Sequence, residues 1–270
     1  MRPEQTKVYD AEYRVVDESP TTQSAPRPPA DEPDEESDGI MFSKVRRNRY
    51  LLTGITALAS IGAYALWLGW EFAVGIVVLI FIHEMGHVIA LKRFGVRASA
   101  PIFIPFLGAF IAMKHLPRNA YMEAVVGLGG PVIGSLGALA AWIIYQINGD
   151  PLYLGIAYLG VILNLFNLLP VLPLDGGRAV GAMSRWFWVA GYAALIGLMI
   201  MRPTPFILII LAFGAPEVWA SFRRRKGEES YYAIPFGQRM AVGAVYFGLI
   251  ALLGGALVGM DSDITAFRRG

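Results

Sequence analysis

Long apolar runs separated by short polar connections dominate the chain from Tyr50 to Met260. Seven of these runs approach the length of about 20 apolar residues that a helix needs to cross a bilayer. They are residues 51–70, 72–91, 121–146, 152–173, 186–201, 204–220 and 238–259. The fifth and sixth are short, so they either span as a hairpin or only dip into the membrane. The pattern predicts an all-α polytopic membrane protein with about six to seven transmembrane helices.

One apolar run, residues 98–113, is too short to span and contains Pro101, Pro105 and Gly108. Phe and Ile residues between such breakers favour an extended hairpin over a helix. Non-helical backbone at membrane depth must be covered by protein or line a wet cavity. We therefore expect a short re-entrant or interfacial β-hairpin-like segment after the second span, bordering a functional site. A connector that lies along the membrane surface is the alternative.

Residues 1–43 differ from the rest of the chain because they are polar and acidic, with a run of Asp and Glu at positions 31–36. Too few apolar side chains are present to offset the entropy of ordering this segment. It is expected to be a disordered cytoplasmic tail. The full chain is 55% hydrophobic and 16% charged, against about 25% charged in soluble domains, which supports the membrane class.

Basic residues mark one side of the membrane. Lys44, Arg46, Arg47 and Arg49 precede the first run, which predicts a cytoplasmic N-terminus by the positive-inside rule. Alternate connections then carry further Lys and Arg, whereas the opposite ones carry Glu71, Asp150 and a single Arg202. We expect an integral multi-pass protein of the cell membrane. A net charge of +2 gives no reason to expect a nucleic-acid partner.

The second apolar run contains the motif His83-Glu84-Met85-Gly86-His87. On a helix the two imidazoles lie one turn apart on one face, where they can hold a tetrahedral Zn²⁺. Glu84 is placed to act as a general base on the water that such a site activates. Gly86 would let another helix backbone come close. Ionisable groups are costly at membrane depth, so this cluster indicates a functional site.

A catalytic zinc site needs a third protein ligand. The chain has no Cys and three His, so the ligand must be His, Asp or Glu. Asp175 closes the fourth run at its cytoplasmic end, at the depth of His87. Glu123 and His115 are on the same predicted side and remain competitors.

Residues Asn167 to Gly177 read Asn-Leu-Leu-Pro-Val-Leu-Pro-Leu-Asp-Gly-Gly and resemble the second signature of the site-2 protease family of intramembrane zinc metalloproteases. That family pairs a His-Glu-x-x-His motif with such a segment two spans later. The glycine-rich stretch 127–131 fits the family's middle helix. The resemblance covers about residues 72–180 and divides the chain into regions. These are the tail 1–43, a first span 44–71, a catalytic core 72–180 and C-terminal spans with a short tail, 181–270.

The resemblance implies one Zn²⁺ per chain, with His83, His87 and Asp175 as ligands and Glu84 as the general base. It implies that Asn167 binds near the substrate or the oxyanion, and that the hairpin pairs with an unwound substrate strand. The implied function is that of a zinc metalloendopeptidase. It would cleave the transmembrane segment of a membrane protein, with a single-span protein as the expected substrate, near the cytoplasmic face. We expect no inserted PDZ or CBS domain, because the connections have no room for one.

The alternative is a non-proteolytic zinc-binding membrane protein, either a transporter or an inactive scaffold. A transporter would spread ionisable groups along a pathway, whereas those of this chain cluster at one depth. An inactive scaffold has no reason to keep Glu84 beside the two histidines.

Overall fold

The computed structural model describes residues 35–112, 117–222 and 229–269; side chains of residues 35–49 and of scattered positions after 205 are also not described. Most of the predicted tail and His115 therefore lie outside the described residues. The elements are α1 (Glu35–Leu68), α2 (Trp70–Arg93), β1 (Ile102–Ile104), β2 (Gly108–Phe110), α3 (Ala120–Asn148), α4 (Pro151–Asn167), α5 (Asp175–Met183), α6 (Trp186–Met201), α7 (Pro205–Phe222), α8 (Glu229–Tyr232) and α9 (Phe236–Arg269).

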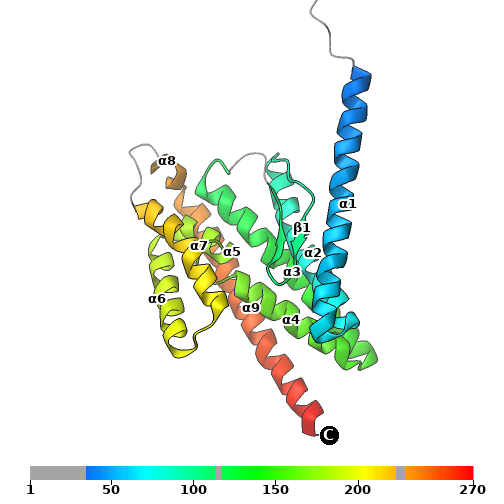
Figure 1. Cartoon of the computed structure of the whole chain (residues 1–270). Helices are drawn as coiled ribbons and strands as arrows, with labels where there is room; N and C mark the ends of the chain where they lie inside the picture. The colour runs from blue at the N-terminus through cyan, green and yellow to red at the C-terminus, as the bar shows by residue number, and fades with distance from the viewer. Residues whose placement is uncertain (1–34, 113–116, 223–228, 270) are drawn as a thin grey trace, which may run out of the picture. The chain divides into compact units, whose positions relative to one another are not determined.

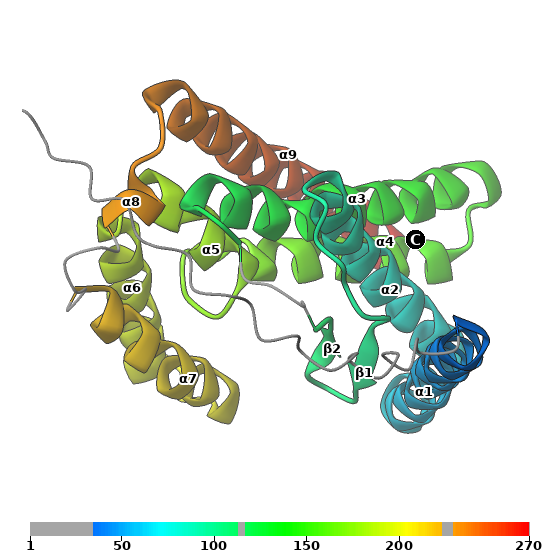
Figure 2. The same ribbon diagram turned by 90° about the horizontal axis from the view of Figure 1, so that it is seen from above.

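Helix α3 is the centre of the helical packing in the unit formed by residues 44–270. It packs against α2, α4, α5 and α9, and Figure 2 shows it running alongside α4. Polar caps set its ends. The Asn119 side chain accepts a hydrogen bond of 2.9 Å from the Met122 amide, and Gly149 closes the helix in a left-handed conformation. Asp150 then caps α4, so a two-residue turn makes α3 and α4 neighbours.

The predicted hairpin is confirmed. Strands β1 and β2 pair antiparallel, with Ile102 opposite Phe110 and Ile104 opposite Gly108. Gly108 has a φ of +100°, a backbone conformation that glycine adopts without strain. Phe106 has a φ of +65°, which is uncommon for a bulky residue.

Helix α1 fastens this hairpin along β1. The Thr53 hydroxyl donates to the Pro101 carbonyl at 2.7 Å, and the Phe103 amide donates to the Thr56 hydroxyl at 3.2 Å. The Phe106 amide donates to the Tyr64 hydroxyl at 3.1 Å. The contact at Phe103 occupies a backbone group on the β1 edge that faces away from β2, and the bond from Tyr64 supports the unusual conformation of Phe106 in the turn.

The C-terminal helices α6 and α9 both contact α5. Helices α6 and α7 run side by side in Figures 1 and 2, and α9 packs against α4 and α5. Buried Trp188, Tyr246 and Leu253 join these helices to the same apolar core as α3 and α4.

Among the described residues, four helices are long and apolar enough to cross a membrane: Tyr50–Leu68, Trp70–Arg93, Ala120–Asn148 and Phe236–Asp261. Many large apolar side chains on these helices face outward, including Leu66, Val78 and Leu252. Outward apolar surface of this extent suits a lipid environment. The helical fold with a small antiparallel sheet is therefore as predicted, whereas a count of six to seven spans stays a prediction.

One predicted boundary is wrong. The fourth apolar run, residues 152–173, is helical only as far as Asn167, and α4 is a helix of 17 residues. Residues 168–174 form an irregular loop, because Pro170 and Pro173 cannot donate the amide hydrogen bonds of a helix. Asp175 therefore begins the short helix α5 instead of closing the fourth span.

Candidate metal centre

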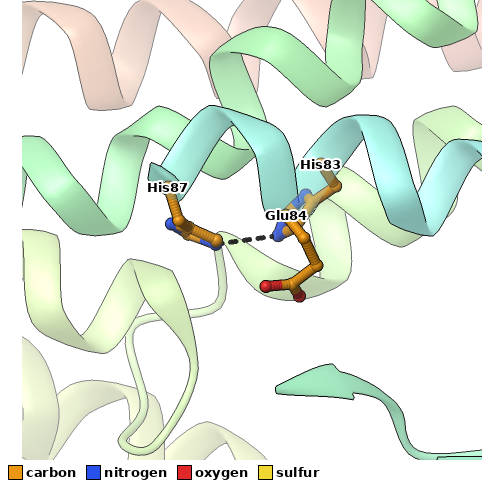
Figure 3. Close-up of side chains that lie close together, drawn as sticks. All are labelled: His83, Glu84 and His87. Atoms are coloured by element: carbon orange, nitrogen blue, oxygen red, sulfur yellow. Dashed lines mark hydrogen bonds between the residues drawn. The ribbon is translucent and has the colours of Figure 1, made fainter. Parts of the chain in front are cut away.

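Helix α2 presents His83 and His87 on one face, one turn apart, as the spacing predicts. Their Nε2 atoms are 3.2 Å apart, and Figure 3 shows the two rings turned toward each other. Both side chains are largely buried, with 5% of His83 and 13% of His87 exposed. The pair is therefore shielded from most of the bulk water.

Asp175 comes to the same point from the start of α5. Its Oδ2 atom lies 3.0 Å from Nε2 of His83 and 3.2 Å from Nε2 of His87. A separation of 92 residues between His83 and Asp175 is thus closed by the packing of α2, α3 and α5. The three side-chain atoms form a compact triangle.

Hydrogen bonds at the far side of each imidazole define which nitrogen carries its proton. His87 Nδ1 lies 2.8 Å from the Val126 carbonyl oxygen, which can only accept, so Nδ1 must donate. His83 Nδ1 lies 2.9 Å from Oδ1 of Asn164. The Asn164 amide donates its own N–H to the Gly160 carbonyl at 2.7 Å, which leaves Oδ1 as the acceptor for His83.

In the neutral imidazoles, both Nε2 atoms consequently carry lone pairs. They face each other and the Asp175 carboxylate across 3.0–3.2 Å. Three acceptors at such short range repel one another unless protons or a cation lie between them. Ligand atoms about 2.0–2.2 Å from a tetrahedral zinc are themselves about 3.3–3.6 Å apart, slightly more than the separations in this triangle. The donor set and its spacing therefore fit a zinc ion.

Small residues on α3 leave room for this triangle. A Cβ at Gly130 would lie 2.6 Å from Nε2 of His83, and one at Gly127 would lie 3.0 Å from the Asp175 carbonyl oxygen. A Cβ at Gly129 would lie 2.7 Å from the Gly86 carbonyl oxygen. The close backbone approach expected at Gly86 is thus present. The glycines of α3 let its backbone lie directly against the two imidazoles and the start of α5.

The loop before Asp175 is held at several carbonyl groups. Tyr246 on α9 donates to Leu168 at 2.7 Å, and Tyr192 on α6 donates to Leu172 at 2.9 Å. The indole of Trp188 donates to Gly177 at 2.7 Å, just after the aspartate. Because these donors belong to α6 and α9, the C-terminal helices fix the position of a carboxylate in the core.

Glu84 adjoins the triangle without being part of it. One of its oxygens and one nitrogen of each imidazole lie within 4.8 Å of one another. Its carboxylate points away from the His83–His87 contact in Figure 3. This position suits a group that acts on a molecule bound beside the triangle. A carboxylate ligand from Glu84 is the geometric alternative, but Asp175 is closer to both imidazoles.

Three other candidates have different surroundings. Asn167, at the end of α4, donates to the Leu163 carbonyl at 3.0 Å and shows no contact with the triangle among the described residues. Glu123 accepts a hydrogen bond of 2.7 Å from the Tyr231 hydroxyl, so this competitor for the third position is engaged elsewhere. Asn164, which the sequence analysis did not single out, orients His83. Its position one helical turn before Asn167 was the only sequence pattern that could have drawn attention to it.

Comparisons with known proteins bear on the same region. Residues 71–154 match the model of peptidase family M50. A zinc metalloprotease of Methanocaldococcus jannaschii is 32% identical over 111 residues, which are 39% of this chain and 32% of the relative. Stage IV sporulation protein FB of Bacillus subtilis is 27% identical over 105 residues, 38% of this chain and 36% of the relative. The chain thus spans about a third of the length of these curated relatives.

Among solved structures, a site-2 protease from Methanocaldococcus jannaschii is similar over 73% of this chain and 86% of that chain. The sequence identity is 24% and the TM-score is 0.40.

Proposed function

We propose, from the match of residues 71–154 to the model of peptidase family M50, that the chain is an intramembrane zinc metalloendopeptidase of the site-2 protease type. The proposed reaction is hydrolysis of a peptide bond in a transmembrane segment of another membrane protein. The proposed ligands of one Zn²⁺ per chain are His83, His87 and Asp175. The observation that carries the proposal is the convergence of their three acceptor atoms at 3.0–3.2 Å.

Zinc held there would polarise the scissile carbonyl and make water a stronger acid. Glu84 takes a proton from the attacking water and passes it to the leaving amine, because its carboxylate adjoins the triangle on the same helix. Asn164 and the Val126 carbonyl keep the imidazoles in the required tautomer throughout. Asn167, with its Oδ1 atom in no described hydrogen bond, is proposed to bind the substrate backbone.

Helical peptide bonds are shielded, so the substrate must be locally unwound before it is cut. The hairpin offers a place for an extended strand. Its β1 edge is occupied by Thr56, whereas the Ala109 backbone on the outer edge of β2 shows no partner among the described residues. We propose that substrate pairs with the hairpin, which also contacts α2, the helix that carries His83 and Glu84.

The proposed location is the cell membrane, with the N-terminus and the site toward the cytoplasm. Lys92 and Arg93 end α2 little more than one turn after His87, which supports a site near the basic side of the membrane. A substrate would then be cut near its cytoplasmic end.

A single substitution tests the proposal. Glu84→Gln keeps the size of the side chain but removes the base. We expect cleavage of a single-span reporter in proteoliposomes to fall about 10²–10⁴-fold, with bound zinc unchanged. Glu71→Gln is the matched control, since Glu71 is an exposed carboxylate in the first turn of the same helix. It should cleave like the parent.

Metal analysis separates the alternatives. A parent chain that binds zinc but leaves every reporter uncut, with Glu84→Gln indistinguishable from it, would support a non-proteolytic zinc protein. A parent chain without stoichiometric zinc would contradict the proposed centre itself.

A further inference from the structure

A cavity lies at the C-terminal end of α5, the end opposite Asp175. It has a volume of about 470 Å³ and opens between the C-terminal end of α5, the start of α6, the end of α7, α8 and the start of α9. Figure 1 shows α8 beside the ends of these helices. Two guanidinium groups, from Arg185 and Arg239, line it together with the aromatic residues Trp186, Phe222 and Tyr232.

Arg239 is fixed in the wall of this cavity. Its Nη1 donates to the Met183 carbonyl at 3.0 Å, and its Nη2 donates to the Tyr232 carbonyl at 2.6 Å. Backbone carbonyls are neutral, so these bonds orient the guanidinium without neutralising its charge. Two of its five N–H groups remain after the bond from Nε to the Ile234 carbonyl. The charge is therefore preorganised.

Arg185 supplies the second charge. It is exposed, and its guanidinium carbon lies 5.1 Å from the centre of the Phe222 ring. A cation stacked on an aromatic ring is positioned but keeps its full charge. Within the described residues, no carboxylate lines the cavity or forms an ion pair with either arginine. Two positive charges in one cavity, with no carboxylate among its described lining residues, favour an anionic ligand.

The surroundings indicate where this ligand comes from. Trp186 begins α6 and is 66% exposed, as expected of an aromatic side chain at the membrane surface. In the sequence, Phe222 is followed directly by Arg223, Arg224, Arg225 and Lys226, which mark the predicted cytoplasmic side. An exposed Trp next to a predicted cytoplasmic connection favours a cavity at the level of the lipid headgroups. Basic pockets between helices at this level suit phosphate-bearing lipids.

We propose that this cavity binds the phosphate of an anionic phospholipid headgroup. Arg239 and Arg185 hold the phosphate oxygens, and the exposed aromatic side chains contact the glycerol and acyl region. Helix α5 begins with Asp175, and its C-terminal residues line this cavity. Lipid bound in the cavity therefore also stabilises the position of α5. The site does not depend on the protease proposal, since none of its residues belongs to the metal centre.

The test measures lipid binding to the purified full chain by native mass spectrometry. Phosphatidylglycerol and phosphatidylcholine with identical acyl chains are titrated separately. We expect tighter binding of phosphatidylglycerol, weakened about fivefold by Arg185→Gln and largely restored in Arg185→Lys. Arg202→Gln is the matched control, because Arg202 is an exposed arginine at the other end of α6. It should leave the affinity unchanged.

Inorganic phosphate provides the second arm. If phosphate at millimolar concentration displaces the lipid in an Arg185-dependent way, the site takes free phosphate as well as headgroups, and the proposed chemistry stands. If it does not, a lipid is the specific occupant. Equal affinity for the two lipids in the parent chain, or equal loss in Arg185→Gln and Arg202→Gln, would overturn the proposal. The comparison of the two lipids uses only the parent chain, so it remains decisive even if a variant fails to fold.

Discussion

The phenolic hydroxyl of Tyr246 donates a buried hydrogen bond of 2.7 Å to the carbonyl oxygen of Leu168. Tyr246 belongs to α9, and Leu168 is the first residue after α4 in the loop that leads to Asp175. The C-terminal helices therefore have a structural role in the candidate metal centre. They hold the loop that precedes Asp175, the residue that supplies the third side chain of the triangle.

Removing that hydroxyl should loosen the carboxylate. In Tyr246→Phe the buried Leu168 carbonyl loses its partner, which destabilises the fold by about 1–3 kcal/mol. We expect weaker zinc binding in a chelator competition and a lower cleavage rate. Tyr145→Phe is the control, since the Tyr145 hydroxyl on α3 makes no described hydrogen bond. Equal zinc affinity in both variants would mean that the loop holds Asp175 without α9.

Asn164 should govern zinc affinity through His83. Asn164→Ala removes the acceptor that keeps the proton on Nδ1, so His83 can turn or change tautomer. Loss of such a partner weakens metal binding about 10–100-fold. Asn167→Ala is the informative comparison. We expect it to keep zinc and to raise KM for the reporter, because its proposed role is with substrate. If both variants lose zinc equally, the two roles are not distinct.

Gly130 should tolerate no side chain. In Gly130→Ala the new Cβ would meet His83 Nε2 at 2.6 Å and His87 Cε1 at 2.5 Å, so the imidazoles must move apart. Zinc content and cleavage should both fall severely while the helical circular dichroism is kept. Gly197→Ala on α6 has no heavy atom within 4 Å of its Cβ and should behave as the parent does. An active Gly130→Ala enzyme would contradict the observed ring positions.

Metal removal should destabilise the chain. Without a cation, the lone pairs of two imidazoles and a carboxylate face each other at 3.0–3.2 Å. A ligand present at about 1,000 times its Kd stabilises the folded state by about 4 kcal/mol. We therefore expect a chelator to lower the midpoint of thermal unfolding of the parent, and added zinc to restore it. Asp175→Asn should respond much less. An identical shift in both would place the metal elsewhere.

Several features of the site follow from local sequence patterns. The spacing of His83 and His87 puts both rings on one helix face, and the prolines and glycine of residues 98–113 produce the hairpin. Gly86 indicates the close approach of another backbone, which the structure identifies as that of α3 at Gly129. Each of these features depends on a few neighbouring residues, so periodicity and backbone preference are sufficient to predict it.

Other features could not be read from the chain. Asp175 and Glu123 are both carboxylates on the same predicted side, and only the structure shows one beside His83 and the other bonded to Tyr231. The end of α4 at Asn167 was missed because an apolar run continues through the prolines.

The sequence by itself determined which side chains share a helix face, where the backbone must bend, and that a zinc-type ligand set lies in an apolar region. Tertiary structure alone decided which carboxylate completes the triangle, that Asn164 orients His83, and that α6 and α9 support the loop before Asp175. Helical periodicity fixes the direction of a side chain relative to its own axis. The rotation and depth of one helix against another depend on packing across the whole core, which no single segment encodes.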